Sequence, residues 1–153
     1  MGMIKVMIAD DEERICQLIE ALIDWESLHM EVAGIAHNGL EACEMVKQIK
    51  PDILITDIRM PGCNGLDLIE NVKKSVEDLQ VVIISGYAQF AYAQTAIKFG
   101  VGDYLLKPIN KVELASTLQK FKERIEERLQ LKEEQLWIQH KSEADIRLFR
   151  ANL

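Results

Sequence analysis

Ile53-Leu54-Ile55-Thr56-Asp57 is the stretch that decides the fold, and Ile58-Arg59-Met60-Pro61-Gly62 follows it directly. A short apolar run bounded by Pro51 and by Pro61-Gly62 predicts a buried strand over residues 53–57. Asp57 would then lie at the carboxyl end of a central strand, where open α/β sheets place their ligand sites. Asp10 and Asp11 follow the first apolar run of the chain in the same way.

Five short apolar runs, rich in Val and Ile, alternate with helical patterns along the chain. Continuous apolar runs of this length are typical of strands buried on both faces. The predicted strands are Ile4–Ala9, Glu31–Ala36, Ile53–Asp57, Gln80–Ser85 and Asp103–Leu106. The helices predicted between them are Glu12–Trp25, 38–50, Leu66–Lys74 and Ala88–Phe99. Strict alternation of strand and helix predicts an α/β fold with a doubly wound, five-stranded parallel sheet. A barrel of eight such units does not fit within 153 residues.

The last segment of the chain has a different character, since residues 111–150 contain no Gly and no Pro. One apolar stripe runs along a predicted extended C-terminal helix through Leu114, Leu118, Phe121, Ile125 and Leu129. The beginning of this helix should pack on the sheet. The part after Arg128 is too long for that purpose, and it is either a signalling helix that pairs with a second copy or a solvated helix.

Charge and composition limit the possible functions. The net charge is −7, and residues 1–119 carry 18 acids and 10 bases, which gives −8. An acidic surface of this kind is unsuited to nucleic acid. No apolar run approaches the roughly 20 residues that span a bilayer, and no signal peptide is visible. Three widely spaced cysteines form neither a disulfide framework nor a zinc pattern, so we expect a cytoplasmic location. The lack of a long apolar run predicts that the chain does not associate with a membrane.

Polar residues close or directly follow four of the five predicted strands. The set is Asp10, Asp11, Asp57, Ser85 and Lys107. The carboxyl ends of parallel strands share one edge, so these side chains should converge there. Three carboxylates in one pocket repel each other unless a cation such as Mg²⁺ neutralises them. Lysine suits phosphate, a hydroxyl can donate a hydrogen bond, and a carboxylate can form an aspartyl-phosphate.

Each of these residues also has an ordinary structural explanation. The acidic run at residues 10–13 could complement a helix N-terminus, Ser85 could cap a helix, and Lys107 could lie on the surface. The occurrence of all of them at strand ends favours phosphoryl chemistry. No P-loop, dinucleotide fingerprint or Ser/His/Asp pattern competes with this interpretation.

Four stretches, in order and at matching spacing, resemble the response-regulator receiver domains of two-component signalling. They are Ile8-Ala9-Asp10-Asp11-Glu12, Asp57-Ile58-Arg59-Met60-Pro61-Gly62, Ile84-Ser85-Gly86-Tyr87 and Tyr104-Leu105-Leu106-Lys107-Pro108, and the resemblance covers residues 3 to about 125. The resemblance implies a flavodoxin-like strand order 2-1-3-4-5 and a histidine kinase that donates a phosphoryl group to Asp57. It implies that Asp10, Asp11, Asp57 and the backbone carbonyl of Arg59 hold Mg²⁺. It further implies that Ser85 and Lys107 contact the phosphoryl group and that Lys107–Pro108 is a cis peptide.

The same resemblance implies a switch at Ser85 and Tyr104. The hydroxyl would move toward the phosphoryl group and the aromatic ring would turn inward, which changes the face made by the fourth helix, fifth strand and fifth helix. Tyr104 is equally compatible with a half-buried strand residue. A homodimer through this face or through the C-terminal helix is expected. Arg59 should alter the lifetime of the phosphoryl group.

Residues 85–104 are similar to receivers joined to AraC-type DNA-binding domains. We therefore expect a receiver domain at 1–128, a helical linker at 129–153, and an output domain that is missing from this chain and would make all contacts with DNA. The alternative is a stand-alone phosphotransfer or protein-binding receiver. A Mg²⁺-dependent phosphatase is a third possibility, but such enzymes usually carry a second Asp where Arg59 stands. The expected role is that of a switch, not an enzyme, apart from its own phosphorylation and dephosphorylation.

Overall fold

Five parallel strands form one sheet in the computed structural model, which describes residues 2–63, 65–86 and 90–151. The strands are β1 (Ile4–Ala9), β2 (Met30–Ala36), β3 (Ile53–Thr56), β4 (Gln80–Ser85) and β5 (Asp103–Leu106). Their order across the sheet is β2-β1-β3-β4-β5, which confirms the predicted fold class and strand order. Strand β3 ends one residue earlier than predicted, so Asp57 begins the loop that follows it.

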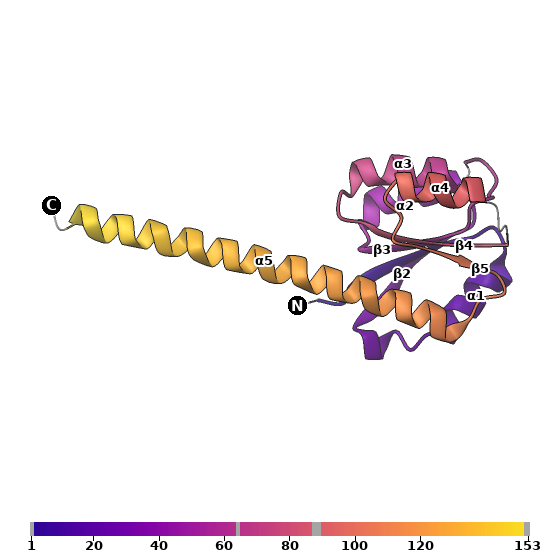
Figure 1. The fold of residues 1–153 in the computed structure, drawn as a ribbon, viewed down its shortest axis with the longest axis horizontal. Coiled ribbons are helices and arrows are strands. Elements are labelled where there is room, and N and C mark those ends of the chain that lie inside the picture. Colours follow the sequence, from indigo (N-terminus) through magenta and orange to yellow (C-terminus); the bar gives the residue numbers. More distant parts are fainter. Residues whose placement is uncertain (1, 64, 87–89, 152–153) are drawn as a thin grey trace. The chain divides into compact units, whose positions relative to one another are not determined.

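Helices cover both faces of the sheet (Figure 1). They are α1 (Glu13–Leu22), α2 (Gly39–Ile49), α3 (Gly65–Ser75), α4 (Phe90–Lys98) and α5 (Lys111–Ala151), with a 3₁₀ turn at Glu26–Leu28. Helices α2, α3 and α4 lie on one face, while α1 and the first turns of α5 lie on the other. The predicted start of the fourth helix at Ala88 lies outside the described residues.

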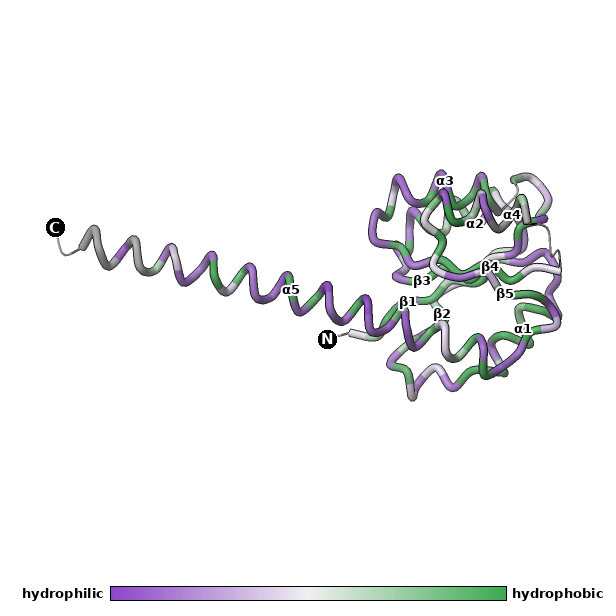
Figure 2. The backbone as a smooth tube through the Cα atoms, in the orientation of Figure 1, coloured by the Kyte–Doolittle hydropathy of each residue, from purple (hydrophilic) through white to green (hydrophobic). Residues whose placement is uncertain are grey.

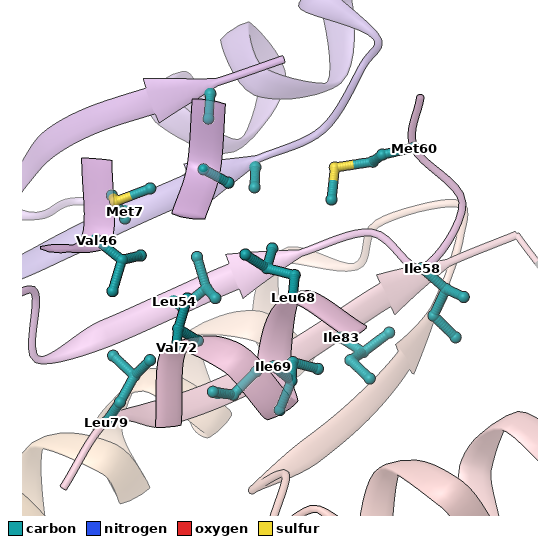
Figure 3. Packing of buried hydrophobic residues seen from close by; sticks show 14 of the residues in the cluster. Met7, Val46, Leu54, Ile58, Met60, Leu68, Ile69, Val72, Leu79 and Ile83 are labelled. Atoms are coloured by element: carbon teal, nitrogen blue, oxygen red, sulfur yellow. The ribbon is translucent and has the colours of Figure 1, made fainter. Parts of the chain in front are cut away.

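The apolar sequence of the strands explains why the sheet is buried between two helical layers. Figure 2 shows the central strands mostly in green, the colour of hydrophobic residues. Met7, Leu54 and Ile83 are fully buried and belong to a core cluster that also includes Leu68 and Val72 of α3. Figure 3 shows these side chains filling the layer between the sheet and the helices. Burying each such side chain stabilises the fold by about 1.5–3 kcal/mol.

The register of the strands aligns their carboxyl ends. Ala9 pairs with Ala36 on one side and with Thr56 on the other, and Thr56 pairs with Ile83. Asp10 follows Ala9 and Asp57 follows Thr56, so both aspartates leave the sheet at the same level. The fold therefore delivers carboxylates from β1 and β3 to one edge.

Helix α1 is shorter than the predicted helix Glu12–Trp25. The chain becomes extended at Ile23, and the indole nitrogen of Trp25 donates a hydrogen bond across 3.0 Å to the carbonyl of Glu20. Asp24 accepts a hydrogen bond from the backbone of Ser27, which starts the 3₁₀ turn. Side-chain hydrogen bonds to the backbone thus end the helix although the apolar pattern of the sequence continues.

Helix α2 begins as its sequence predicts. The side chain of Asn38 accepts a hydrogen bond across 2.8 Å from the backbone of Glu41. The Asn38 amide also donates to the Glu41 carboxylate across 3.5 Å. This reciprocal pair fixes the first turn of α2, which lies beside the loop that follows β3.

Helix α5 is continuous over Lys111–Ala151, as predicted, but the chain divides into two compact units within it. The first unit is Met1–Phe121, and the second is Lys122–Leu153. Within the first unit Leu114, Leu118 and Phe121 are fully buried, which confirms that the beginning of the helix packs on the domain. The functional boundary predicted between residues 128 and 129 stays a prediction. Each described helix is too short or too polar to cross a membrane.

Candidate functional site

Asp57 stands at the point where β3 leaves the sheet. Its backbone N–H donates across 3.0 Å to the carbonyl of Ala9, which continues the pairing between β1 and β3. The residue is 6% exposed, and Oδ1 accepts a hydrogen bond across 2.7 Å from the backbone of Ile58. The carboxylate is therefore held in one orientation by its own loop, with Oδ2 turned toward other groups.

Lys107 supplies the positive charge of the site. Its Nζ lies 3.0 Å from Asp57 Oδ2 and 3.2 Å from Asp10 Oδ2, and it is 4.0 Å from Glu12 Oε1. The backbone of Lys107 donates across 2.8 Å to the carbonyl of Ser85, which fixes the position of the residue beyond β5. The Lys107–Pro108 peptide is cis, as the resemblance implies. One ammonium group thus bridges carboxylates from β1 and β3.

The buried charges in this cluster affect each other. Burial raises the pKa of Asp10, although the backbone N–H of Glu12 and the charge of Lys107 act against it. Burial would lower the pKa of Lys107, but hydrogen bonding to Asp57 and the charge of Asp10 outweigh it and leave that pKa raised. Lys107 therefore remains protonated at neutral pH, while Asp10 carries its charge at a cost in free energy.

Three consecutive acids make up the carboxylate cluster that could hold a cation in the described part of the chain. Oxygen atoms of Asp10, Asp11 and Glu12 lie within 4.8 Å of one another. Asp10 is buried, and the other two are exposed. Carboxylates with room for water are the ligands that Mg²⁺ prefers. The predicted ligand set contains Asp57 and the Arg59 carbonyl in place of Glu12, and it stays a prediction.

Glu12 is a residue of this site that the sequence interpretation did not assign. Its backbone donates across 2.9 Å to Asp10 Oδ1, and its side chain approaches Lys107. It lines the same cleft as Asp11, Asp57, Arg59, Gly86 and Lys107. The unbroken run of acids at residues 10–13 was the available signal, but only Asp10 and Asp11 of that run were assigned to the site.

Ser85 and Tyr104 have different environments. Ser85 ends β4 and is fully buried, and its backbone carbonyl accepts the hydrogen bond from Lys107. Tyr104 is half-buried on β5, where it packs against the core cluster and lines a groove with Ala96 and Ile97 of α4. The structure therefore brings Asp10, Asp11, Asp57 and Lys107 together with Ser85 at the same edge, whereas Tyr104 lies on β5 beside α4.

Comparison with known proteins shows a single family. Residues 6–119 match the model of the response regulator receiver domain. The chain is 43% identical over 117 residues to the uncharacterized transcriptional regulatory protein YesN of Bacillus subtilis, spanning 76% of this chain and 32% of YesN. It is 39% identical over 112 residues to the transcriptional regulatory protein HptR of Staphylococcus aureus, spanning 73% of this chain and 44% of HptR.

A solved structure shows the same relationship. The receiver domain of AraT, a response regulator from Geobacillus stearothermophilus, superposes with a TM-score of 0.78 and 39% sequence identity. The match covers 82% of this chain and 97% of the AraT domain. The chain thus corresponds to a whole receiver domain, but it spans less than half the length of the two transcriptional regulators that it matches.

Proposed function

Because this chain belongs to the response regulator receiver family, we propose that it is a switch that takes a phosphoryl group from a histidine kinase onto Asp57 with the help of Mg²⁺. The single observation that carries this proposal is the position of Lys107 Nζ, 3.0 Å from Asp57 Oδ2. The Ile58 backbone fixes Oδ1 of Asp57, and Oδ2 faces the cation of Lys107. This arrangement suits a carboxylate that receives a phosphoryl group.

The transfer is a nucleophilic displacement at phosphorus. Asp57 Oδ2 attacks the phosphoryl group of the donor, a P–O bond forms, and the P–N bond to the kinase histidine breaks. Lys107 exchanges its contact with the Asp57 carboxylate for one with a phosphoryl oxygen, where its charge offsets the negative charge of the transition state. The hydrogen bond from Ile58 keeps Oδ1 in place during the attack.

The acids beside Asp57 fit a hard divalent cation. Asp10 and Asp11 would hold Mg²⁺ together with Asp57 and the Arg59 carbonyl, and Glu12 is close enough to contribute directly or through water. When bound, the ion neutralises charge on the acids and on the phosphoryl oxygens. Arg59, exposed at the mouth of the cleft, would influence how long the phosphoryl group survives.

The change of charge at Asp57 would be read by Ser85 and Tyr104. Ser85 is buried and its backbone carbonyl accepts from Lys107, which supports a role for its hydroxyl as a contact of a phosphoryl oxygen. Tyr104 lines the groove along α4, and rotation of its ring would alter the surface of α4, β5 and α5. The protein would thus act as a cytoplasmic switch, without turnover of an external substrate.

The relatives support transcription as the output. YesN and HptR are transcriptional regulatory proteins, and this chain matches only part of each. We propose that the chain controls an AraC-type DNA-binding domain beyond its own C-terminus, so that contact with DNA belongs to that domain. The acidic surface of residues 1–119 agrees with this division of labour.

Self-association is the second partner interaction that we propose. The later turns of α5 expose Leu131, Leu136, Trp137 and Ile138, each by more than half of its surface. Figure 2 shows green segments there within a largely purple helix. Ile97 on α4 and Leu106 on β5 are also exposed, by 74% and 46% respectively. Pairing with a second copy through α5 or through the α4-β5-α5 face would bury these side chains.

Phosphoryl uptake can be measured directly. The chain is incubated with Mg²⁺ and acetyl phosphate, and its intact mass is followed over time. We expect the wild type to gain one phosphoryl group and Asp57→Asn to gain none. Removal of Mg²⁺ with EDTA should stop the reaction. An equal gain of mass in Asp57→Asn, or no gain in the wild type, would contradict the proposal.

A further inference from the structure

The loop that starts at Asp57 rests directly on the first turns of α2. The carbonyl of Pro61 accepts a hydrogen bond across 3.2 Å from the backbone of Gly39. A Cβ atom added to Gly39 would lie 2.5 Å from Cys63 Cβ, so the loop and the helix are in contact without space for a methyl group. Only a glycine at this position lets Cys63 approach the helix so closely.

Cys43 lies one helical turn after Gly39, on the same side of α2. Cys43 and Cys63 are partly exposed thiols outside any disulfide, and both pack against the same core cluster. Cys43 is an electrostatic neighbour of the Cys63 thiol, so the two side chains lie close to each other. Cys16, the third cysteine, is buried elsewhere and donates across 3.5 Å to the carbonyl of Asp10.

We propose that Cys43 and Cys63 form a redox site, in which an intramolecular disulfide ties the phosphoacceptor loop to α2. The oxidant is a two-electron peroxide. One thiol is oxidised to a sulfenic acid with release of water, and the second thiol then attacks its sulfur and releases another water. The two thiols together lose two electrons and two protons, and the O–O bond of the peroxide is broken.

The bond has a consequence for the site described above. Sulfur atoms in contact lie farther apart than bonded ones, so formation of the bond draws the loop toward α2. The same loop carries Arg59 and begins at Asp57, six residues before Cys63. This part of the inference rests on the proposed function: the oxidised protein should accept a phosphoryl group more slowly, because the reacting carboxylate is displaced.

The chemistry sets the conditions for the test. Burial raises the pKa of the Cys63 thiol, and the neighbouring Cys43 and Asp67 raise it further. The thiolate is the reactive form, so oxidation should be slow at neutral pH and is best followed under mildly alkaline conditions. Transient regulatory disulfides of this kind are compatible with a reducing cytoplasm.

The first test is the mass of the folded chain after treatment with hydrogen peroxide. The wild type should lose two hydrogens without dimerising, and a tryptic digest should contain one linked pair of peptides bearing Cys43 and Cys63. Dithiothreitol should reverse the change. Cys43→Ser and Cys63→Ser should each prevent it, and Cys16→Ala should not, with circular dichroism confirming that each variant is folded. Stable addition of oxygen, a bond to Cys16 or a bond between two copies would overturn the proposal.

The second test separates the redox site from the phosphoryl chemistry. Uptake from acetyl phosphate is compared for oxidised and reduced protein, and we expect a loss of about tenfold on oxidation, since small displacements of reacting groups cost one to two orders of magnitude in rate. Peroxide should not change the rate of phosphoryl uptake by Cys63→Ser. Equal rates for the two redox forms would overturn the regulatory role. No uptake by the reduced protein would instead refute the proposed function, while leaving the disulfide result intact.

Discussion

Thr117 donates a hydrogen bond across 2.6 Å to Asp103 Oδ2 and so ties α5 to β5 beside Tyr104. Lys120 lies 3.4 Å from the same oxygen, and the backbone of Tyr104 donates to Oδ1 across 2.9 Å. Burial by itself would raise the pKa of Asp103, but the hydrogen bonds from Thr117 and Tyr104 and the charge of Lys120 outweigh it and lower that pKa. The ionised carboxylate is therefore the form that holds β5 and α5 together.

Replacing Thr117 with Val tests this link. The valine side chain keeps the volume but removes the donor, and we expect a loss of about 1.5 kcal/mol in the free energy of unfolding, the usual scale for a hydrogen bond to a charged acceptor. Urea denaturation at neutral pH measures the loss. Ser116→Ala changes an exposed neighbour on the same helix and should alter stability by less than about 0.5 kcal/mol.

The difference in the free energy of unfolding between the wild type and Thr117→Val should also depend on pH. A lowered pKa means that the contribution of Asp103 is present above its ordinary pKa of 3.8 and is lost as the pH falls through the lower folded value. The wild type and Thr117→Val should therefore become more similar in free energy of unfolding when the pH falls below the folded pKa of Asp103. A gap that stays constant at acidic pH would show that the hydroxyl acts through packing.

The pKa of Asp10 is shifted in the opposite direction from that of Asp103. Burial raises its pKa, so the folded state favours the protonated carboxyl, and the stability gained in this way is lost as the pH rises from 3.8 through the folded value. Asp10→Asn should therefore raise the free energy of unfolding by about 1 kcal/mol at neutral pH. Functional residues often lower the stability of a protein in this way. The asparagine oxygen can still accept from Glu12 and Lys107.

The same variant should bind Mg²⁺ more weakly, because one carboxylate is lost. Asp11→Asn is the matched control, since Asp11 belongs to the same cluster but is exposed. It should also weaken Mg²⁺ binding, with little change in stability. An Asp10→Asn protein that is less stable than the wild type in metal-free buffer would refute the assigned cost of burying this charge.

Lys107→Gln removes the cation between Asp10 and Asp57. Uptake of a phosphoryl group from acetyl phosphate should fall by roughly 10²-fold, the scale seen when one preorganised donor to a transition state is removed. Lys111→Gln changes an exposed lysine at the start of α5 and should leave uptake unchanged. Equal rates in Lys107→Gln and the wild type would show that this ammonium does not take part in the transfer.

The sequence was sufficient to predict the strands and their edge, because both follow from local patterns. Runs such as Ile53–Thr56 are buried on both faces, and strict alternation leaves few ways to connect them. The same patterns placed Asp10, Asp57, Ser85 and Lys107 at strand ends. Apolar periodicity failed at Trp25, because the indole hydrogen bond that ends α1 leaves no trace in that periodicity.

Contacts between distant residues were beyond the reach of the sequence. The hydrogen bond between Thr117 and Asp103 depends on how α5 lies on β5, and the approach of Cys63 to Gly39 depends on the path of a loop. Glu12 was known as part of an acidic run, but its place beside Lys107 required the fold. Local rules thus predict which groups reach an edge, whereas packing decides which of them meet.

Gly39→Ala should destabilise the fold although alanine is the better helix former. Propensity favours alanine in a helix by about 1 kcal/mol, but the added Cβ would meet backbone atoms of Cys63, which cannot yield without moving the loop. We expect a net loss of about 1–2 kcal/mol in thermal or urea unfolding. Gly86→Ala is the control, because a Cβ there meets nothing within 4 Å. Gly39→Ala at wild-type stability would mean that the loop does not rest on α2 in solution.

Ending the chain at Arg128 tests whether the later turns of α5 drive self-association. Among the described residues, the deletion removes five exposed apolar side chains, Leu129, Leu131, Leu136, Trp137 and Ile138. Their burial between two copies would be worth about 25 cal/mol per Å². Sedimentation velocity over a range of concentrations should show a weaker dimer for the shortened chain.

Leu136→Glu should weaken association in the full chain, whereas Gln135→Glu, which adds the same charge at the neighbouring exposed position, should change it much less. An unchanged concentration dependence would count against pairing through the later turns of α5, and a dimer that persists in both chains would indicate pairing through the α4-β5-α5 face. Ile97→Glu on that face would then be the variant that separates the two copies.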